Sequence, residues 1–196
     1  MSADMTNCLI VGVGGQGTIL ASRLMGLAAM SVGLGVRGSE TIGMAQRGGS
    51  VASHVRMGRD IHSPLILPGE ADVILAFEPC EGLRAITWLK PGGTMIVCDR
   101  PVQPFSSGSA GGYDAAEVMA HIRSSVVCPR VLSGEYITEK CGVRCLNAAV
   151  LGAAIACGVP PFSMSDMERV IDERFPPHIA DMNKNALRVG AEMIEK

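Results

Sequence analysis

The stretch Cys8-Leu-Ile-Val-Gly-Val-Gly-Gly-Gln-Gly17 leads into an apolar helical pattern that continues to Met30. An apolar run that stops at closely spaced glycines and then becomes helical is typical of a buried parallel strand, a tight turn and a helix start. Glycine suits this turn because it has no Cβ to oppose a sharp bend or the close approach of another group. The stretch predicts the opening unit of a Rossmann-like α/β fold.

The glycine spacing in this turn matches the dinucleotide-binding fingerprint G-x-G-x-x-G. Backbone N–H groups at the start of the helix favour an anion. The fingerprint also calls for an acidic residue about 20 positions further on, and the acid nearest that place, Glu40, comes a little late and within a glycine-rich segment. An NAD-type site and a purely structural turn are both open. The candidate binding residues here are Gly12, Gly14, Gly15, Gln16 and Gly17.

The composition predicts a chain with a protein partner. The 196 residues include 47% hydrophobic and 18% charged residues, against a usual charged share of about 25%. So few charges cover a monomer's surface poorly, and we expect part of that surface to be buried against another chain. The 17 Lys and Arg against 19 Asp and Glu form no basic stripe, so we expect no nucleic-acid partner.

The apolar runs are also too short for a membrane span, because Gly, Arg and Ser interrupt each of them before about 18 residues. The first residues, Met-Ser-Ala-Asp-Met-Thr, lack the basic start and apolar core of a signal peptide. We expect a cytoplasmic protein without a membrane partner.

The seven cysteines include no Cys-x-x-Cys pair, and the four histidines do not stand at metal-finger spacing from them. We expect no metal and no iron-sulfur cluster on this chain, and cysteines that are buried, reduced thiols. Cys141 and Cys145 are four residues apart, a spacing that would place them on one face of a helix.

Strand and helix patterns alternate along the rest of the chain. Residues 51–57 alternate as a strand does, and with 61–67 they predict an inserted β-hairpin. Further strands are expected at 72–77 and 94–99. The predicted fold is α/β, a Rossmann-like mostly parallel sheet flanked by helices, with the inserted β-hairpin and a helical C-terminus, all in a single domain of residues 1–196.

Two polar features fall outside the glycine turn. Gly38 to Ser50 is predicted to be a polar loop, in which Arg47, next to Gly48 and Gly49, either holds a carboxylate or phosphate or pairs with an acid across an interface. Asn147 carries the only side-chain amide in an apolar helix predicted at 142–158, and a buried Asn needs hydrogen-bond partners. It either ties the helix to a loop or contacts a ligand.

The final helix carries an apolar stripe at spacings of three and four. The stripe covers about two heptads, too few for a coiled coil. We expect a helix that docks onto its own sheet or onto a partner. The stripe consists of Ile179, Met182, Ala186, Val189 and Met193.

Several motifs together resemble the gamma-type domain of 2-oxoacid:ferredoxin oxidoreductases, and within that family the likeness is greatest to the small beta subunit of the indolepyruvate enzymes. The resemblance covers essentially the whole chain. The motifs are Gly12-Val-Gly-Gly-Gln-Gly17, Gly38-Ser-Glu-Thr-Ile-Gly-Met-Ala-Gln-Arg-Gly-Gly-Ser50, Ser53-His-Val-Arg56, Asp72 with its strand, and Asn147 through Gly152.

The resemblance implies a subunit that is inactive alone, in a complex that decarboxylates indolepyruvate or another aryl pyruvate, reduces ferredoxin and forms an acyl-CoA. It implies that thiamine diphosphate, Mg and iron-sulfur clusters are bound by a large partner subunit, with CoA as co-substrate. It implies no catalytic residue on this chain, which would self-associate when isolated. Two other classes stay open from the residues themselves: an independent Rossmann-type nucleotide-binding protein or reductase, and an assembly protein without a ligand.

Overall fold

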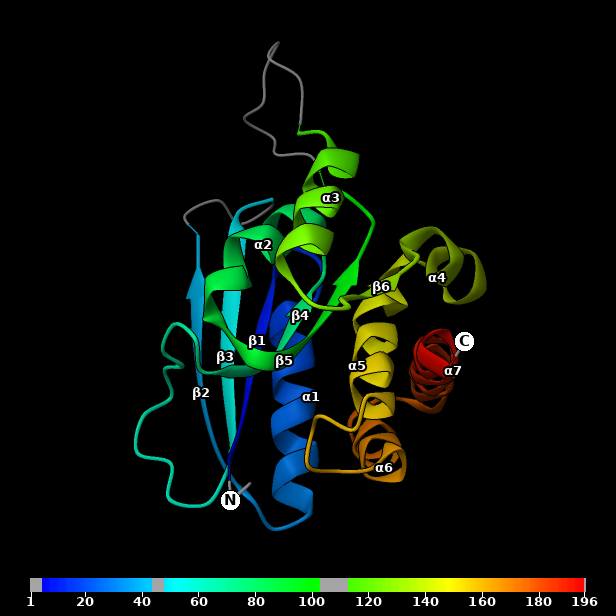
Figure 1. The fold of residues 1–196 in the computed structure, drawn as a ribbon. Helices are drawn as coiled ribbons and strands as arrows, with labels where there is room; N and C mark the ends of the chain where they lie inside the picture. The colour runs from blue at the N-terminus through cyan, green and yellow to red at the C-terminus, as the bar shows by residue number, and fades with distance from the viewer. Residues whose placement is uncertain (1–4, 44–47, 103–112, 196) are drawn as a thin grey trace.

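The computed structural model describes residues 5–43, 48–102 and 113–195, and every statement below concerns those ranges. Six strands form one sheet in the order β2-β3-β1-β4-β5-β6 (Figure 1). In the part β1-β4-β5-β6 of this order, neighbouring strands are parallel. Strand β3 runs antiparallel to both of its neighbours, β1 and β2. The strands are β1 (Met5–Val13), β2 (Gly35–Ile42), β3 (Ser50–Gly58), β4 (Ala71–Ala76), β5 (Leu89–Cys98) and β6 (Arg130–Leu132). The expected mostly parallel α/β sheet is confirmed.

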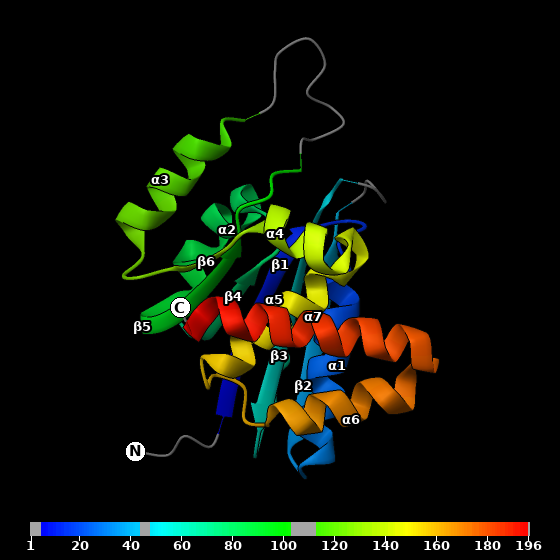
Figure 2. The same cartoon turned by 90° about the vertical axis from the view of Figure 1, so that its right-hand side faces the viewer.

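Helices cover both faces of this sheet (Figures 1 and 2). One face packs against α1 and α5, with α6 and α7 next to them, and the other packs against α2 and α3. The helices are α1 (Thr18–Ser31), α2 (Pro79–Ala85), α3 (Ala115–Ser125), α4 (Gly134–Cys141), α5 (Leu146–Ala156), α6 (Met164–Arg174) and α7 (Pro177–Glu195), with short 3-10 turns η1 (Ile86–Trp88) and η3 (Val143–Cys145).

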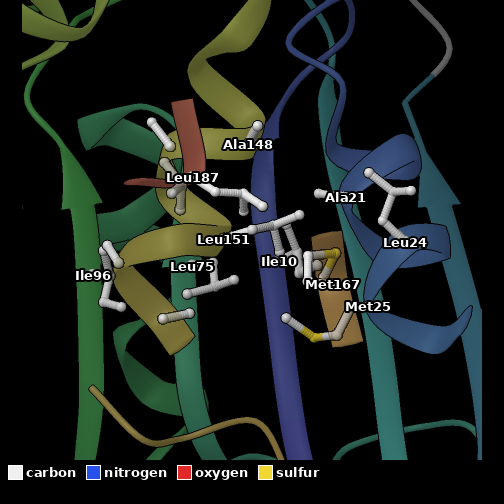
Figure 3. Close-up of a cluster of buried hydrophobic side chains, with 14 of the residues drawn as sticks. Ile10, Ala21, Leu24, Met25, Leu75, Ile96, Ala148, Leu151, Met167 and Leu187 are labelled. Carbon is white, nitrogen blue, oxygen red and sulfur yellow. The ribbon is translucent and has the colours of Figure 1, made fainter. Parts of the chain in front are cut away.

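Strand β1 is the centre of the core, because its side chains alternate between two apolar clusters. Ile10 belongs to the cluster beneath α1 and α5, and Figure 3 shows it on the same side as Met25, Leu151 and Met167. Leu9 and Val11 belong to the cluster on the opposite face. A strand buried on both faces is expected to be almost continuously apolar, as this one is.

The hairpin is present, but its predicted second strand was wrong. Besides β1, β3 pairs antiparallel with β2, from Gly35 opposite Gly58 to Ile42 opposite Val51. The first part of the predicted loop, Gly38 to Ile42, is therefore strand. Residues 61–67 form no strand; the Arg56 guanidinium instead donates to the carbonyls of Ser63 and Leu65, each at 3.1 Å.

The last helix docks onto α5 of its own chain, and its predicted stripe was partly wrong. Met182 is exposed, while small residues line the contact with α5. A Cβ at Gly152 would lie 1.9 Å from the Leu187 carbonyl oxygen, and one at Gly190 would lie 1.8 Å from that of Ala149. The two helix backbones therefore touch at these glycines, which an apolar stripe alone does not predict.

The cysteines are all free, and only Cys8, Cys98 and Cys145 are buried; Cys128 is exposed, against the expectation of buried thiols throughout. Cys141 and Cys145 do not share a helix, because Gly142, with φ 83°, separates α4 from the turn before α5. In the described ranges no group of three or more metal-binding side chains comes together, and no helix has the length and apolar character needed to cross a membrane.

Candidate functional site at the glycine turn

Gln16 closes the glycine turn with its side-chain amide. Its Oε1 accepts from the Val13 N–H at 2.9 Å, and its Nε2 donates to the Phe77 carbonyl at 3.0 Å. The amide thus joins the carboxyl ends of two neighbouring parallel strands, β1 and β4. Gly12 lies beneath it, where a Cβ would approach Gln16 Oε1 to 2.7 Å and Phe77 Cβ to 3.0 Å. Gly12 is therefore glycine because the turn folds back over it.

Gly14 binds another part of the chain through its backbone. Its N–H donates to the Gly49 carbonyl at 2.8 Å, and its carbonyl accepts from the Gly48 N–H at 3.4 Å. Gly48 has φ 72°, which favours glycine. The structure thus brings the predicted residues Gly48 and Gly49 against the glycine turn. Arg47, predicted beside them, lies outside the described residues.

Gly15, which is exposed, and Gly17, which is half-buried, form the outer end of the turn. Both have positive φ, 100° and 82°, which side chains disfavour. A Cβ on Gly17 would lie 2.8 Å from Nδ2 of Asn147. Asn147 is 4% exposed, and its Oδ1 accepts from the Ala148 N–H at 2.9 Å. Within the described residues its Nδ2 makes no hydrogen bond, so a donor amide is held against the start of α1.

The starts of two helices meet at this place. Neither α1, after Gly17, nor α5, after Cys145, has a side-chain cap or an acid in its first turn. A small hollow of about 130 Å³ between them is lined by Gly15, Gln16, Arg100, Val102, Val143 and Leu146. Helix-start N–H groups, the Asn147 amide donor and a guanidinium are together suited to an anion such as a phosphate.

Arg100 was not among the sequence-predicted site residues. It lies two residues after the end of β5, and its guanidinium donates to Thr138 Oγ1 at 3.3 Å. Its position after a parallel strand was the available signal, since ligands of open α/β sheets bind at the carboxyl ends of the strands. Asp99, next to it, accepts from the Gly134 N–H at 2.8 Å and so fixes the start of α4.

Two features differ from an NAD site. In such a site the second glycine lets the pyrophosphate approach the backbone, but here Gly49 occupies that approach at Gly14. The acid should follow the strand next to β1, but β3 lies between β1 and β2, and the Glu40 carboxylate accepts from Ser22 Oγ at 3.2 Å. Neither observation favours the independent nucleotide-binding alternative.

Comparison with known proteins places the chain among 2-oxoacid oxidoreductases. The family model described as pyruvate ferredoxin/flavodoxin oxidoreductase matches residues 7–193. The chain is 40% identical to "Indolepyruvate oxidoreductase subunit IorB" of Archaeoglobus fulgidus over 94% of this chain and 92% of that protein.

Solved structures share the fold. Pyruvate oxidoreductase subunit PORC of Thermotoga maritima superimposes with a TM-score of 0.69 at 22% identity, covering 96% of each chain. The 2-oxoglutarate:ferredoxin oxidoreductase of Magnetococcus marinus, solved with 2-oxoglutarate, coenzyme A and succinyl-CoA bound, superimposes with a TM-score of 0.72 at 18% identity. The match spans 99% of this chain and 32% of that one. On the family match and the identity to IorB, the chain belongs to the pyruvate ferredoxin/flavodoxin oxidoreductase family.

Proposed function

We propose that this chain, residues 1–196 acting as one gamma-type domain, is the small subunit of an indolepyruvate:ferredoxin oxidoreductase. The enzyme would cleave the carboxylate from indolepyruvate or another aryl 2-oxoacid, release CO2, transfer the acyl group to CoA and pass the electrons to ferredoxin. The observation that carries the proposal is the 40% identity to an IorB subunit over nearly the full length of both chains.

The partner would be a larger subunit that binds thiamine diphosphate, Mg and the iron-sulfur clusters. Thiamine diphosphate supplies the decarboxylation chemistry when bound. The described part of this chain brings together no group of metal-binding side chains, which is compatible with that division. We assign no catalytic residue to this chain.

The glycine turn would bind a phosphate of CoA. Residues at the uncapped starts of α1 and α5 line one small hollow together with Arg100, and no acid is among the lining residues. The Asn147 amide lies beside it, against Gly17. A phosphate there would receive hydrogen bonds from the backbone around Gly15 to Gly17 and charge neutralisation from Arg100. This chain's contribution is to hold and orient CoA, while the acyl group is formed on the partner.

The proposal is tested by anaerobic co-expression of this chain with the large subunit. Indolepyruvate-dependent reduction of ferredoxin or a viologen is measured with each chain alone and with both. Activity that requires both chains is the expected result. A large subunit equally active without this chain, or no complex between the two, would contradict the proposal.

A further inference from the structure

Two carboxylates are buried at the start of α2, outside the hollow described above. Glu78 is 1% exposed and Glu81 is 5% exposed. Burying a carboxylate is costly unless hydrogen bonds and opposite charges compensate for the lost water. The bonds of these two residues therefore indicate what they hold in place.

Glu78 holds α2 and the chain that leads into α3. One of its oxygens accepts from the Glu81 N–H and so caps α2, and the other accepts from the Tyr113 hydroxyl at 2.5 Å. Burial, followed by the hydrogen bond to Glu78, raises the pKa of Tyr113. The phenol therefore stays a hydrogen-bond donor throughout the neutral range.

Glu81 holds the segment that borders the glycine turn. Its Oε2 accepts from Ser50 Oγ at 2.5 Å, and its other oxygen pairs with the Arg84 guanidinium. Ser50 directly follows Gly49, whose carbonyl accepts from the Gly14 N–H. A change in the position of Glu81 is therefore transmitted to Gly14 through two hydrogen bonds and one peptide unit.

These contacts close into a ring around the turn. From Gly14 the chain continues to Gln16, whose amide donates to the Phe77 carbonyl, and Phe77 precedes Glu78. The ring thus fixes both the turn and the Gly48–Ser50 segment relative to the start of α2. Ser50 itself is exposed, so its hydrogen bond to Glu81 orients a segment at the surface. Burying the Glu81 carboxylate costs free energy, and this orientation of the segment is what the buried charge provides.

We infer that Glu81 is a positioning residue that, through Ser50, holds the Gly48–Ser50 segment against the glycine turn and so sets the affinity of the assembled enzyme for CoA. This inference rests on the proposed function, because it takes CoA as the ligand of the turn. The residue contacts neither CoA nor the reacting atoms. Its effect belongs to binding, and the rate of turnover at saturating CoA is independent of it.

The test measures KM for CoA, KM for indolepyruvate and kcat in the co-expressed complex for Ser50→Ala, Ser50→Thr and Glu81→Gln. Ser50→Ala removes one hydroxyl from an exposed position and leaves the two buried carboxylates, Glu78 and Glu81, in place. We expect it and Glu81→Gln to raise KM for CoA roughly five- to twentyfold, with kcat and KM for indolepyruvate unchanged. Ser50→Thr, which keeps the hydroxyl, should retain the original KM. The matched control is Ser124→Ala, whose hydroxyl bonds only within α3, to the His121 carbonyl.

Gly17→Ala distinguishes the positioning role of Glu81 from the binding of CoA at the glycine turn. If Gly17→Ala raises KM for CoA while Ser50→Ala behaves as Ser124→Ala does, the positioning role is wrong and the CoA site stands. If neither variant changes KM for CoA in an active complex, CoA does not bind at the turn, and both proposals are overturned. A fall in kcat for Ser50→Ala, restored by Ser50→Thr, would also contradict a role confined to binding.

Discussion

The side-chain amide of Gln16 donates to the carbonyl of Phe77 at 3.0 Å, 61 positions further along the chain. The same amide accepts from the Val13 N–H. One side chain thereby satisfies the last backbone groups of two parallel strands, a task that a bound ligand or water would otherwise perform. The turn is stable in this form because Gly12 leaves space for the amide.

Gln16→Leu should destabilise the chain by about 1–3 kcal/mol, because Val13 N–H and Phe77 C=O lose their partners. The stability of Gln16→Glu should lie between that of the original chain and that of Gln16→Leu, since the carboxylate still accepts from the Val13 N–H but cannot donate to the Phe77 carbonyl. The measurement is the free energy of unfolding from urea titrations of the purified chain. Asn185→Ala, at an exposed position on α7, is the control, and an equal effect of Asn185→Ala and Gln16→Leu would contradict the closing role of the amide.

Gly152→Ala and Gly190→Ala should each cost about 3 kcal/mol or more, as expected for overpacking that moves a backbone. The added Cβ would meet a carbonyl oxygen at 1.9 Å or 1.8 Å, so α7 must shift away from α5. The matched control is Gly26→Ala in α1, where the Cβ has ordinary contact at 3.4 Å with Val36. It should be neutral or stabilising by up to about 1 kcal/mol because alanine favours helix. The measurement is the melting temperature of each variant. Equal melting temperatures for Gly152→Ala, Gly190→Ala and Gly26→Ala would contradict the close contact between α5 and α7.

Asn147 variants test whether its amide faces an anion. Asn147→Asp puts a negative charge beside the starts of α1 and α5, so it should raise KM for CoA in the complex more than Asn147→Ala does. The expected increases are roughly tenfold or more for Asp and roughly threefold to tenfold for Ala, from the loss of one charge-assisted hydrogen bond. If Asp and Ala have the same effect, the amide has a structural role only.

The sequence was most informative where a residue's surroundings leave a local pattern. The run from Cys8 to Met30 predicted β1, the turn and α1, because a strand buried on both faces and a helix covered on more than one side are continuously apolar. Asn147 stood out as the single amide in an apolar helix. Gly14 was predicted from glycine spacing alone, and that spacing gave no sign of its hydrogen bond to Gly49, which comes from far along the chain.

Long-range contacts left no such pattern. The part of strand β2 from Gly38 to Ile42 was predicted as a loop because the residues of β2 are exposed or half-buried throughout, so no alternation distinguishes them from a loop. The α5–α7 crossing depends on two single glycines, Gly152 and Gly190, whose meeting only the fold shows. Glu78 and Glu81 look like ordinary surface acids in the sequence, and burial beneath Tyr113 and Ser50 is a property of the tertiary structure.

Because of its buried thiols, we expect the folded chain to lose stability at alkaline pH. Burial raises the pKa of Cys98 from 9.0 to about 11, and burial together with the charge of Asp72 raises that of Cys8 further. An unfolded thiol loses its proton near pH 9, whereas the folded Cys98 keeps it until about pH 11. Stability from this group is therefore fully present below pH 9 and declines as the pH rises from 9 to about 11. Urea midpoints measured across that range should fall, and less steeply in Cys98→Ala.

Thiol labelling checks the same burial independently. At pH 8 in the native state, a disulfide reagent should react first with the exposed Cys128, while Cys8 and Cys98 react only on unfolding. Cys128→Ser should remove the fast phase and leave the slow phase unchanged. Rapid labelling of Cys8 or Cys98 under native conditions would contradict their burial, and with it the expected alkaline loss of stability, because both follow from the thiols being shielded from water beneath the helices.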